Sequence, residues 1–548
     1  MRDSSIPGRH APRTPKKRGF LGSPPHAGAT PSRTACRLLV VVAAALLAVC
    51  GPTRAEADGD DPKGYAARAG DLTLAMDYDK ARAELAKADP QSPAVILAKA
   101  RLALYEEDCD LTTALLARTE VAQMEEGRLI ADVGRGCARV TAATVVDKDD
   151  VNGIVIRYQD ESDRALTPLL VDTVLKARTT LSRDLGVEWK RPTRITVVRD
   201  LLSLSAMTGL PYKAAQTTGT VAVAKWGRVT LLSPRASHHG YPFRDTLTHE
   251  MTHLAIAMQT RDRAPLWLHE GVARREEVRW REPGIFDERP SPESIVMRGM
   301  ELKLDLALDK LGPSIAMLPS ADAAMVAFAE VTSFIKFFAD TSPPDALARL
   351  LLALRTAKTA DDALKEVSGE TLAQWDVRWR ANLAKHPKEP LSPMFGLGAN
   401  PPGLGDSRER SRLAELLMGR SHPAEALTEL EKIPADMLAD PSLRYLRARV
   451  LEAADNVKQA DTLVEDPKQW MASYGPCWAI RGRLARARND NSVADSSFEE
   501  AVAHDPFGIE AACQVLPDGQ ALPADRLKQG APLCEAARKR GDPDVGRE

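Results

Sequence analysis

An alanine recurs every 34 residues near the C-terminus, at Ala426, Ala460 and Ala494. A fixed period of a few dozen residues is typical of one supersecondary unit stacked on its own copies, so it limits the architecture more than any other feature of this chain. The period therefore predicts stacked helical hairpins in the C-terminal part.

The last of the three units carries the fullest pattern, with Trp478, Gly482, Phe498, Ala501 and Pro506. The first two units match the pattern at fewer positions. These are Leu413, Ala414, Leu430 and Ile433 in the first unit, and Leu463 and Val464 in the second. These offsets resemble the tetratricopeptide repeat, a family of paired helices. The resemblance implies a surface that recruits a protein partner or substrate.

A weaker version of the pattern lies near the N-terminus. The residues of its second helix recur there as Ala81, Leu85, Ala88 and Pro93. Residues 95–106 and 111–121 are predicted to form a further helical pair, and packed hairpins of no particular family are the alternative. Aromatic residues make up only 5% of the chain, which favours helices over sheets throughout.

Between these blocks the sequence predicts a small mixed sheet. Residues 153–158 and 194–199 are short β-branched runs, separated by an amphipathic helical stretch at 165–185. Two more apolar runs, at 220–224 and 229–232, flank a hairpin turn. The chain then looks helical as far as residue 383, and Pro and Gly cluster after it as in a linker.

The predicted fold is therefore mainly α, with a small mixed α+β domain between helical hairpins on both sides. The predicted segments are a signal peptide and basic leader (1–57), a helical repeat-like domain (58–147), the domain with the sheet (148–386), a Pro/Gly linker (387–408) and tetratricopeptide-like repeats (409–548).

The leader contains an apolar run of 12 residues, from Leu38 to Val49. That run is too short to span a bilayer and is typical of a secretory signal, with Ala55-Glu56-Ala57 as the cleavage site. The alternative is a lipoprotein signal, because Leu47-Ala48-Val49-Cys50 resembles a lipobox. We expect an exported protein of the periplasm, cell envelope or extracellular space, held at a membrane only if Cys50 is lipidated.

The charge of the mature chain argues against a nucleic-acid partner. The leader carries nine Lys or Arg and two acidic residues, so its removal from a chain of net charge −2 leaves about −9. Five cysteines remain. Oxidation after export would pair Cys109 with Cys137 and Cys513 with Cys534, and buried free cysteines are the alternative.

The stretch Thr-His-Glu-Met-Thr-His at 248–253 is the candidate for chemistry. Residues four apart share one face of a helix, so His249 and His253 can present their imidazoles to one metal ion. Glu250 points about 100° away and can reach a water on that metal. The opposite face carries a core stripe of Leu247, Met251, Leu254 and Met258. A surface helix with two histidines is the alternative.

A metal site of this kind needs a third ligand. The segment 264–273 reads Ala-Pro-Leu-Trp-Leu-His-Glu-Gly-Val-Ala, and Pro265 can begin a helix that carries either His269 or Glu270 inward. Adjacent helical residues point about 100° apart, so only one of the two can face the metal. Geometry from the sequence leaves that choice open.

The pairing of HExxH with P-x-W-L-x-E-G-x-A resembles the gluzincin zinc metallopeptidases, specifically the peptidase MA-like group, over about residues 150–385. The resemblance implies one zinc per chain held by His249, His253 and Glu270, with Glu250 as general base. It also implies that the hairpin ending at Leu232 supplies an edge strand for an extended peptide substrate.

The chain departs from the family in one respect. Gluzincins commonly steady the oxyanion with a Tyr or His after the third ligand, but no tyrosine occurs between Gly271 and Phe395. The remaining candidates for the donor are Tyr241, His238, His239, His269 and Arg274. The leading hypothesis is an exported zinc metallopeptidase, and the alternative is a non-catalytic zinc-containing repeat scaffold that binds proteins or peptides in the cell envelope.

Overall fold

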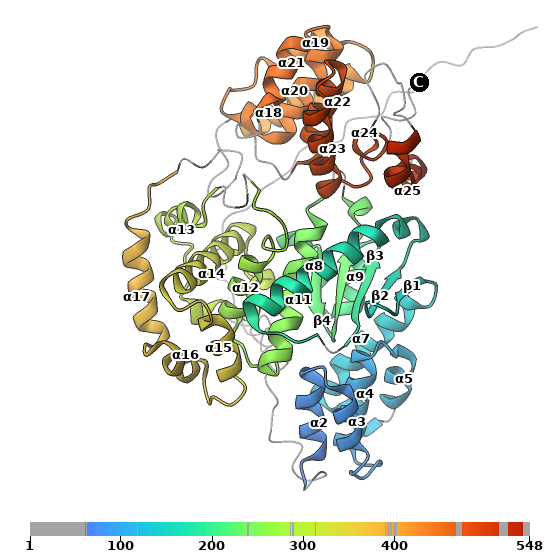
Figure 1. Cartoon of the computed structure of the whole chain (residues 1–548), viewed down its shortest axis with the longest axis vertical. Coiled ribbons are helices and arrows are strands. Elements are labelled where there is room, and N and C mark those ends of the chain that lie inside the picture. The colour runs from blue at the N-terminus through green and yellow to red at the C-terminus, as the bar shows by residue number, and fades with distance from the viewer. Residues whose placement is uncertain are drawn as a thin grey trace, which may run out of the picture. The chain divides into compact units, whose positions relative to one another are not determined.

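A computed structural model describes residues 61, 63–117, 119–189, 191–237, 240–284, 287, 290–312, 314–389, 391, 397, 403–466, 474–514 and 524–540. Within these residues the chain is mainly helical and contains one small mixed sheet (Figure 1). The fold class is confirmed at that level. The predicted signal, its cleavage site and Cys50 lie outside the described residues.

The N-terminal block consists of α2 (Tyr65–Leu74), α3 (Tyr78–Leu85), α4 (Pro93–Tyr105), α5 (Cys109–Leu115), α6 (Thr119–Gln123) and α7 (Glu125–Thr141). Helix α4 begins with Pro93, whose fixed φ suits the first helical position, and the Asp108 side chain caps α5 by accepting from the Leu111 N–H. A disulfide between Cys109 and Cys137 joins α5 to α7, as the sequence predicts.

The sheet contains β1 (Val145–Asp149), β2 (Ile154–Tyr158), β3 (Thr193–Val198), β4 (Ala222–Lys225) and β5 (Arg228–Leu232), in the order β1-β2-β3-β5-β4. The central pairs β2–β3 and β3–β5 are parallel, and the outer pairs are antiparallel. The predicted strands and hairpin are confirmed. Strand β1 was not predicted, and it crosses the predicted domain boundary at residue 148 because it pairs with β2.

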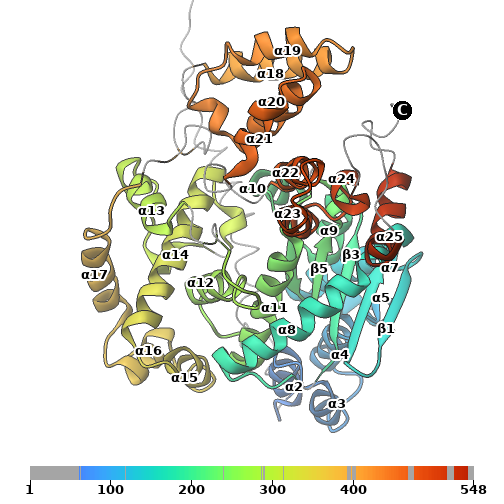
Figure 2. The ribbon, with the colours of Figure 1, turned by 45° about the horizontal axis from the view of Figure 1, so that its top comes forward.

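Helices α8 (Thr167–Leu185) and α11 (Phe243–Thr260) pack against each other and lie along the sheet (Figures 1 and 2). Two short helices, α9 (Leu201–Thr208) and α10 (Tyr212–Thr218), connect β3 to β4. On α11, the predicted core residues Leu247, Met251 and Leu254 are buried. The histidine face of α11 is therefore left for the site.

Six helices follow: α12 (Leu266–Glu276), α13 (Pro292–Glu301), α14 (Ala321–Thr341), α15 (Ala346–Ala353), α16 (Ala360–Ser368) and α17 (Leu372–Leu383). Trp267 of α12 is buried and meets Phe334 of α14 edge to face. At Gly271 a Cβ atom would lie 2.4 Å from Ile335 Cγ1 and 2.6 Å from the Val331 carbonyl oxygen. Only glycine allows α12 and α14 to approach this closely.

The C-terminal block consists of α18 (Leu404–Met418), α19 (Pro423–Leu430), α20 (Pro441–Ala453), α21 (Val457–Glu465), α22 (Gly475–Ala487), α23 (Asn491–His504), α24 (Ile509–Cys513) and α25 (Ala524–Arg540). Helix α18 begins inside the predicted linker. The helices from α18 to α23 pack in consecutive pairs, and the three periodic alanines are fully buried. Cys513 and Cys534 form a disulfide, and Cys477 is a buried thiol.

The turn between β4 and β5 is held by the N-terminal block. A Cβ on Gly227 would lie 2.4 Å from the Tyr78 hydroxyl, and the Trp226 ring meets Tyr105 edge to face. Arg228 is completely buried and donates to the Leu104 carbonyl at 2.8 Å. The N-terminal helices thus fix the hairpin that forms one edge of the sheet.

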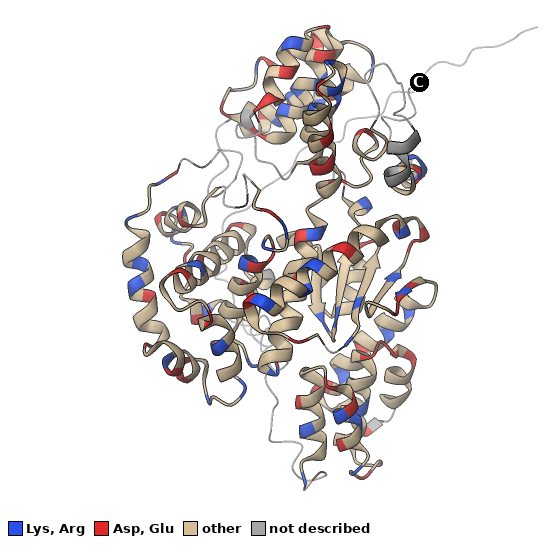
Figure 3. Cartoon of the chain, viewed as in Figure 1, with Lys and Arg blue, Asp and Glu red and all other residues tan. Residues whose placement is uncertain are grey.

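Acidic and basic residues are interspersed along the helices of the described part of the chain (Figure 3). No helix in the described part of the chain combines the length and apolarity that a bilayer crossing needs.

Glu330 of α14 gives a prediction for the pH dependence of stability. It is fully buried, and burial raises its pKa from 4.5 to about 8. The folded protein therefore keeps a proton that the unfolded chain releases, so wild-type stability is lost as the pH rises from 4.5 to about 8. Glu330→Gln should match the wild type near the lower pH and exceed its stability by about 5 kcal/mol above the higher one.

The melting temperatures of both proteins at about pH 5 and about pH 9 measure this difference. Glu366→Gln, at an exposed position on α16, is the matched control and should change neither value. The same Glu330→Gln effect at both pH values would contradict the prediction.

Candidate metal centre

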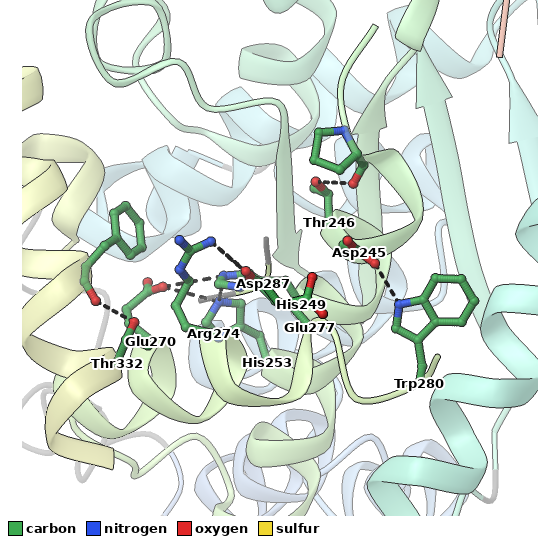
Figure 4. Close-up of polar contacts among 12 residues, drawn as sticks. Asp245, Thr246, His249, His253, Glu270, Arg274, Glu277, Trp280, Asp287 and Thr332 are labelled. Carbon is green, nitrogen blue, oxygen red and sulfur yellow. Dashed lines mark hydrogen bonds and ion pairs between the residues drawn. The ribbon is translucent and has the colours of Figure 1, made fainter. Parts of the chain in front are cut away.

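Three side chains from two helices converge beside the sheet (Figure 4). His249 and His253 lie one turn apart on α11, and their Nε2 atoms are 3.2 Å apart. Glu270 of α12 places Oε2 at 3.6 Å from both of these nitrogens. In the part of the chain that the structure describes, these residues form the one group of three His, Cys, Asp or Glu side chains whose donor atoms lie within 4.8 Å of one another.

The spacing of these three atoms fits a single metal ion. Ligand atoms bound to zinc at about 2.0–2.2 Å with tetrahedral angles lie roughly 3.3–3.6 Å from each other. Here the two Nε2 atoms are 3.2 Å apart, and each of them is 3.6 Å from Glu270 Oε2. Two imidazoles and one carboxylate could therefore hold a metal with little rearrangement and leave a fourth position open.

Glu250 lies next to this group without joining it. It is 7% exposed, and its Oε2 accepts a hydrogen bond of 2.5 Å from the Ala224 N–H of β4. Burial raises the pKa of Glu250 to about 7, and the neighbouring charge of Glu270 acts in the same direction. A carboxylate with such a pKa is suited to taking up and returning a proton near neutral pH.

A second carboxylate orients His249. Glu277, at the C-terminal end of α12, places Oε2 at 3.0 Å from His249 Nδ1. Arg274 holds this carboxylate through two hydrogen bonds of 2.8 and 3.0 Å from one nitrogen. With its Nδ1 proton donated to Glu277, His249 keeps a lone pair on Nε2, the atom that faces His253 and Glu270.

His253 has a different partner. Its Nδ1 lies 3.4 Å from Nδ1 of His269, and His269 Nε2 lies 3.8 Å from Asp262 Oδ1. If His253 presents a lone pair at Nε2, it must donate from Nδ1, so His269 must accept there and carry its own proton on the side of Asp262. Asp262 reaches this position because its φ is 58°, in the left-handed region.

Side-chain contacts join the first turn of α11 to the segment that follows α12. Asp245, in the first turn of α11, accepts from Trp280 Nε1 at 2.9 Å and pairs with Arg281 at 2.8 Å. Arg281 also pairs with Asp287 at 2.8 Å. The segment after α12 is thus anchored on α11, which fixes the angle at which Glu270 approaches the histidines.

The electrostatics of the group favour added positive charge. Burial disfavours a charged imidazole, yet hydrogen bonds to Glu270 and Glu277 outweigh it and raise the pKa of His249 to about 10. Burial also opposes ionisation of Glu270, but His253 and His249 outweigh it and lower the pKa of Glu270 to about 2. Ionised carboxylates in buried surroundings are stable only beside a cation.

The predicted ligands and base all meet here, but two of the predicted oxyanion donors, Tyr241 and His269, do not point into the group. The Tyr241 hydroxyl donates to the Leu232 carbonyl. His269 faces His253 and Asp262. His239 and His238 lie outside the described residues.

Sequence reasoning missed three contributors: Glu277, Asp262 and the Ala224 N–H. Glu277 had a usable signal, because it follows Glu270 by seven residues, two helical turns along the same face. Asp262 and Ala224 had none, since they depend on a left-handed backbone and on the sheet.

The chain matches no family model, no curated protein and no solved structure.

The support that Glu277 gives to His249 leads to a prediction. Glu277→Ala should weaken the affinity for zinc by about 10–100-fold, the usual effect of losing a carboxylate behind a metal-binding histidine. A competition titration against a chelating dye measures the affinity. Glu366→Ala on α16 is the control for loss of a glutamate elsewhere. An affinity equal to that of the wild type would show that Glu277 does not orient the ligand.

Proposed function

We propose that the chain is an exported zinc-dependent metallopeptidase that hydrolyses peptide bonds. The observation that carries the proposal is the convergence of His249 Nε2, His253 Nε2 and Glu270 Oε2 at the spacing of a tetrahedral site. Two histidines and one glutamate with an open fourth position are the ligand set of many catalytic zinc sites. The resemblance to the gluzincin, peptidase MA-like pattern supports the same assignment.

The roles of the residues follow from their positions. A bound zinc would supply Lewis acidity, polarising the scissile carbonyl and lowering the pKa of the attacking water. Glu250, held beside the ligands by the Ala224 N–H, would accept the proton of that water and return it to the leaving amine. Glu277 and His269 would keep the two imidazoles in the tautomer that leaves Nε2 free.

Strand β4 offers a way to bind an extended peptide. It is an edge strand, and the bond from the Leu232 N–H to the Val221 carbonyl makes residues 221 and 232 a hydrogen-bonded pair. Pairs alternate along an antiparallel ladder, so the main-chain groups of Ala222 and Ala224 point away from β5. The Ala224 N–H is donated to Glu250, so a substrate strand could pair with the main-chain groups of Ala222 and with the Ala224 carbonyl, with little dependence on its sequence.

The helical blocks belong to the proposal as recruiting elements. The paired helices from α18 to α23 and the buried alanines at the 34-residue period support a tetratricopeptide-like array that holds a protein partner or substrate. The two disulfides support an oxidising compartment, and so does the secretory-type leader.

One observation favours a second candidate function, a zinc-containing scaffold that binds peptides without cutting them. The hydroxyl of Tyr241 is used by the Leu232 carbonyl, and His269 faces His253, so neither is directed at an oxyanion. Loss of one oxyanion donor typically lowers turnover by about 100–1,000-fold.

A metal analysis combined with a digestion assay tests the proposal. The wild type should contain one zinc per chain and digest an unfolded protein substrate in a chelator-sensitive manner. Glu250→Gln should keep the zinc and lose about 100–10,000-fold in turnover, because only the proton-transferring group is removed. His253→Ala and Glu270→Ala should lose both metal and activity.

Glu366→Gln serves as the control, since it removes an exposed carboxylate of the same domain. Wild-type protein that binds zinc but shows no turnover would favour the scaffold. Wild-type protein that binds no zinc under zinc-replete conditions would rule out both functions.

A further inference from the structure

The C-terminal block contains a pocket that has no residue in common with the metal centre. It has a volume of about 450 Å³ and lies between α20 and α21, where it is lined by Arg447, Leu451, Lys458, Gln459, Thr462 and Leu463. Pockets of this size bind small molecules or a few side chains of a peptide.

Arg447 is the distinctive residue of this pocket. Neighbouring arginines have partners: Arg444 donates to the Leu463 carbonyl, Arg483 pairs with Glu452, and Arg488 pairs with Asp461. Arg447 makes no hydrogen bond or ion pair with any residue that the structure describes, and its Nε is buried. Arg444 and Arg483 also have a buried Nε without a partner, so Arg447 differs in that the rest of its guanidinium has none either, and a ligand that supplies an acceptor gains affinity.

The other lining residues add to the positive charge. Lys458 is exposed at the first turn of α21 and places a second cation on the pocket, whereas no acidic residue lines it. Two acidic residues of α20 and α21 are engaged elsewhere, because Glu452 pairs with Arg483 and Asp461 pairs with Arg488. Two cations without a counter-charge select for an anion.

The apolar residues of the pocket further limit the kind of ligand that it fits. Leu451 is buried and Leu463 half-buried, so apolar surface lies directly beside the cations. A pocket of about 450 Å³ is much larger than an inorganic anion needs. A planar guanidinium matches a carboxylate through two parallel hydrogen bonds. Carboxylates next to apolar side chains are what an acidic peptide presents.

We propose that the pocket formed by Arg447 and Lys458 binds an acidic peptide segment, with a carboxylate on Arg447 and an adjacent apolar side chain on Leu451 and Leu463. This site would act as a docking point that is separate from the metal centre. Its ligand could be a partner or a substrate that carries Asp or Glu beside an apolar residue.

The test measures binding to full-length Glu250→Gln protein, so that cleavage cannot interfere. The probe is a fluorescein-labelled short peptide of alternating Glu and Leu, and its counterpart has Gln in place of Glu. The Glu peptide should bind, and the Gln peptide should bind at least about tenfold more weakly, since a charge-assisted hydrogen bond contributes about a factor of ten.

Arg447→Gln and Lys458→Gln should each lower the affinity for the Glu peptide by about tenfold, and the double variant should lower it by about 100-fold. Arg412→Gln, on the exposed face of α18, is the matched control and should change nothing. Both lining residues project from helix surfaces, and circular dichroism verifies the fold of each variant.

Three results would overturn the proposal: equal affinity for the Glu and Gln peptides, no effect of either lining variant, or displacement of the peptide by inorganic phosphate at equal concentration. The last result would indicate a general anion site. The measurement is repeated with chelator present. The affinity should not change, so a failure of the metallopeptidase proposal leaves this one testable.

Discussion

The accumulation of carboxylates around His249 is the constraint on which the rest of the site depends. Glu250, Glu270 and Glu277 are all largely buried, and apart from the two histidines Arg274 is the one described residue that forms an ion pair with any of them. Such a cluster is stable only if positive charge is supplied. Without a metal the demand falls on His249, whose raised pKa reflects it. A divalent cation among the three ligands would meet the same demand and displace that proton.

The cluster is held in place by packing at some distance from it. Gly271 lets α12 lie close to α14, and Glu270 precedes it directly, so the carboxylate is delivered by a helix crossing that no larger residue permits. On the other side, the N-terminal helices hold the turn at Trp226 and Gly227. That turn sets the position of β4 and hence of the Ala224 N–H that holds Glu250. The N-terminal block therefore takes part in orienting Glu250, the proposed general base.

The sequence predicted what depends on local spacing. His249 and His253 follow from a four-residue separation on one helix, and the buried alanines follow from the period. Strand β1 was not predicted because Val145–Asp149 is mostly polar and half-exposed, so it lacks the pattern of a buried strand. The contact of Asp262 with His269 was not predicted because it requires a left-handed backbone after α11, which is uncommon in residues other than glycine.

The third ligand shows where local reasoning ends. Helical geometry requires that His269 and Glu270 point in different directions, but it does not say which one faces the histidines. The choice depends on how α12 is rotated against α11, and that rotation is set by Trp267 packing on Phe334 and by Asp245 holding Trp280 and Arg281. These contacts span many residues and leave no periodic signal. Resemblance to a family supplied what spacing could not.

The arrangement of α12 also indicates which residue could donate to the oxyanion of the proposed reaction. Arg274 follows Glu270 by one turn and is 43% exposed, and its bonds to Glu277 use one nitrogen only. Its remaining N–H groups make no hydrogen bond with a described residue, in contrast to the hydroxyl of Tyr241. Among the candidates that the structure describes, Arg274 is thus the one with donors to spare beside the ligands. Glu277 would then orient both a metal ligand and an oxyanion donor, which explains why a carboxylate is buried at this point.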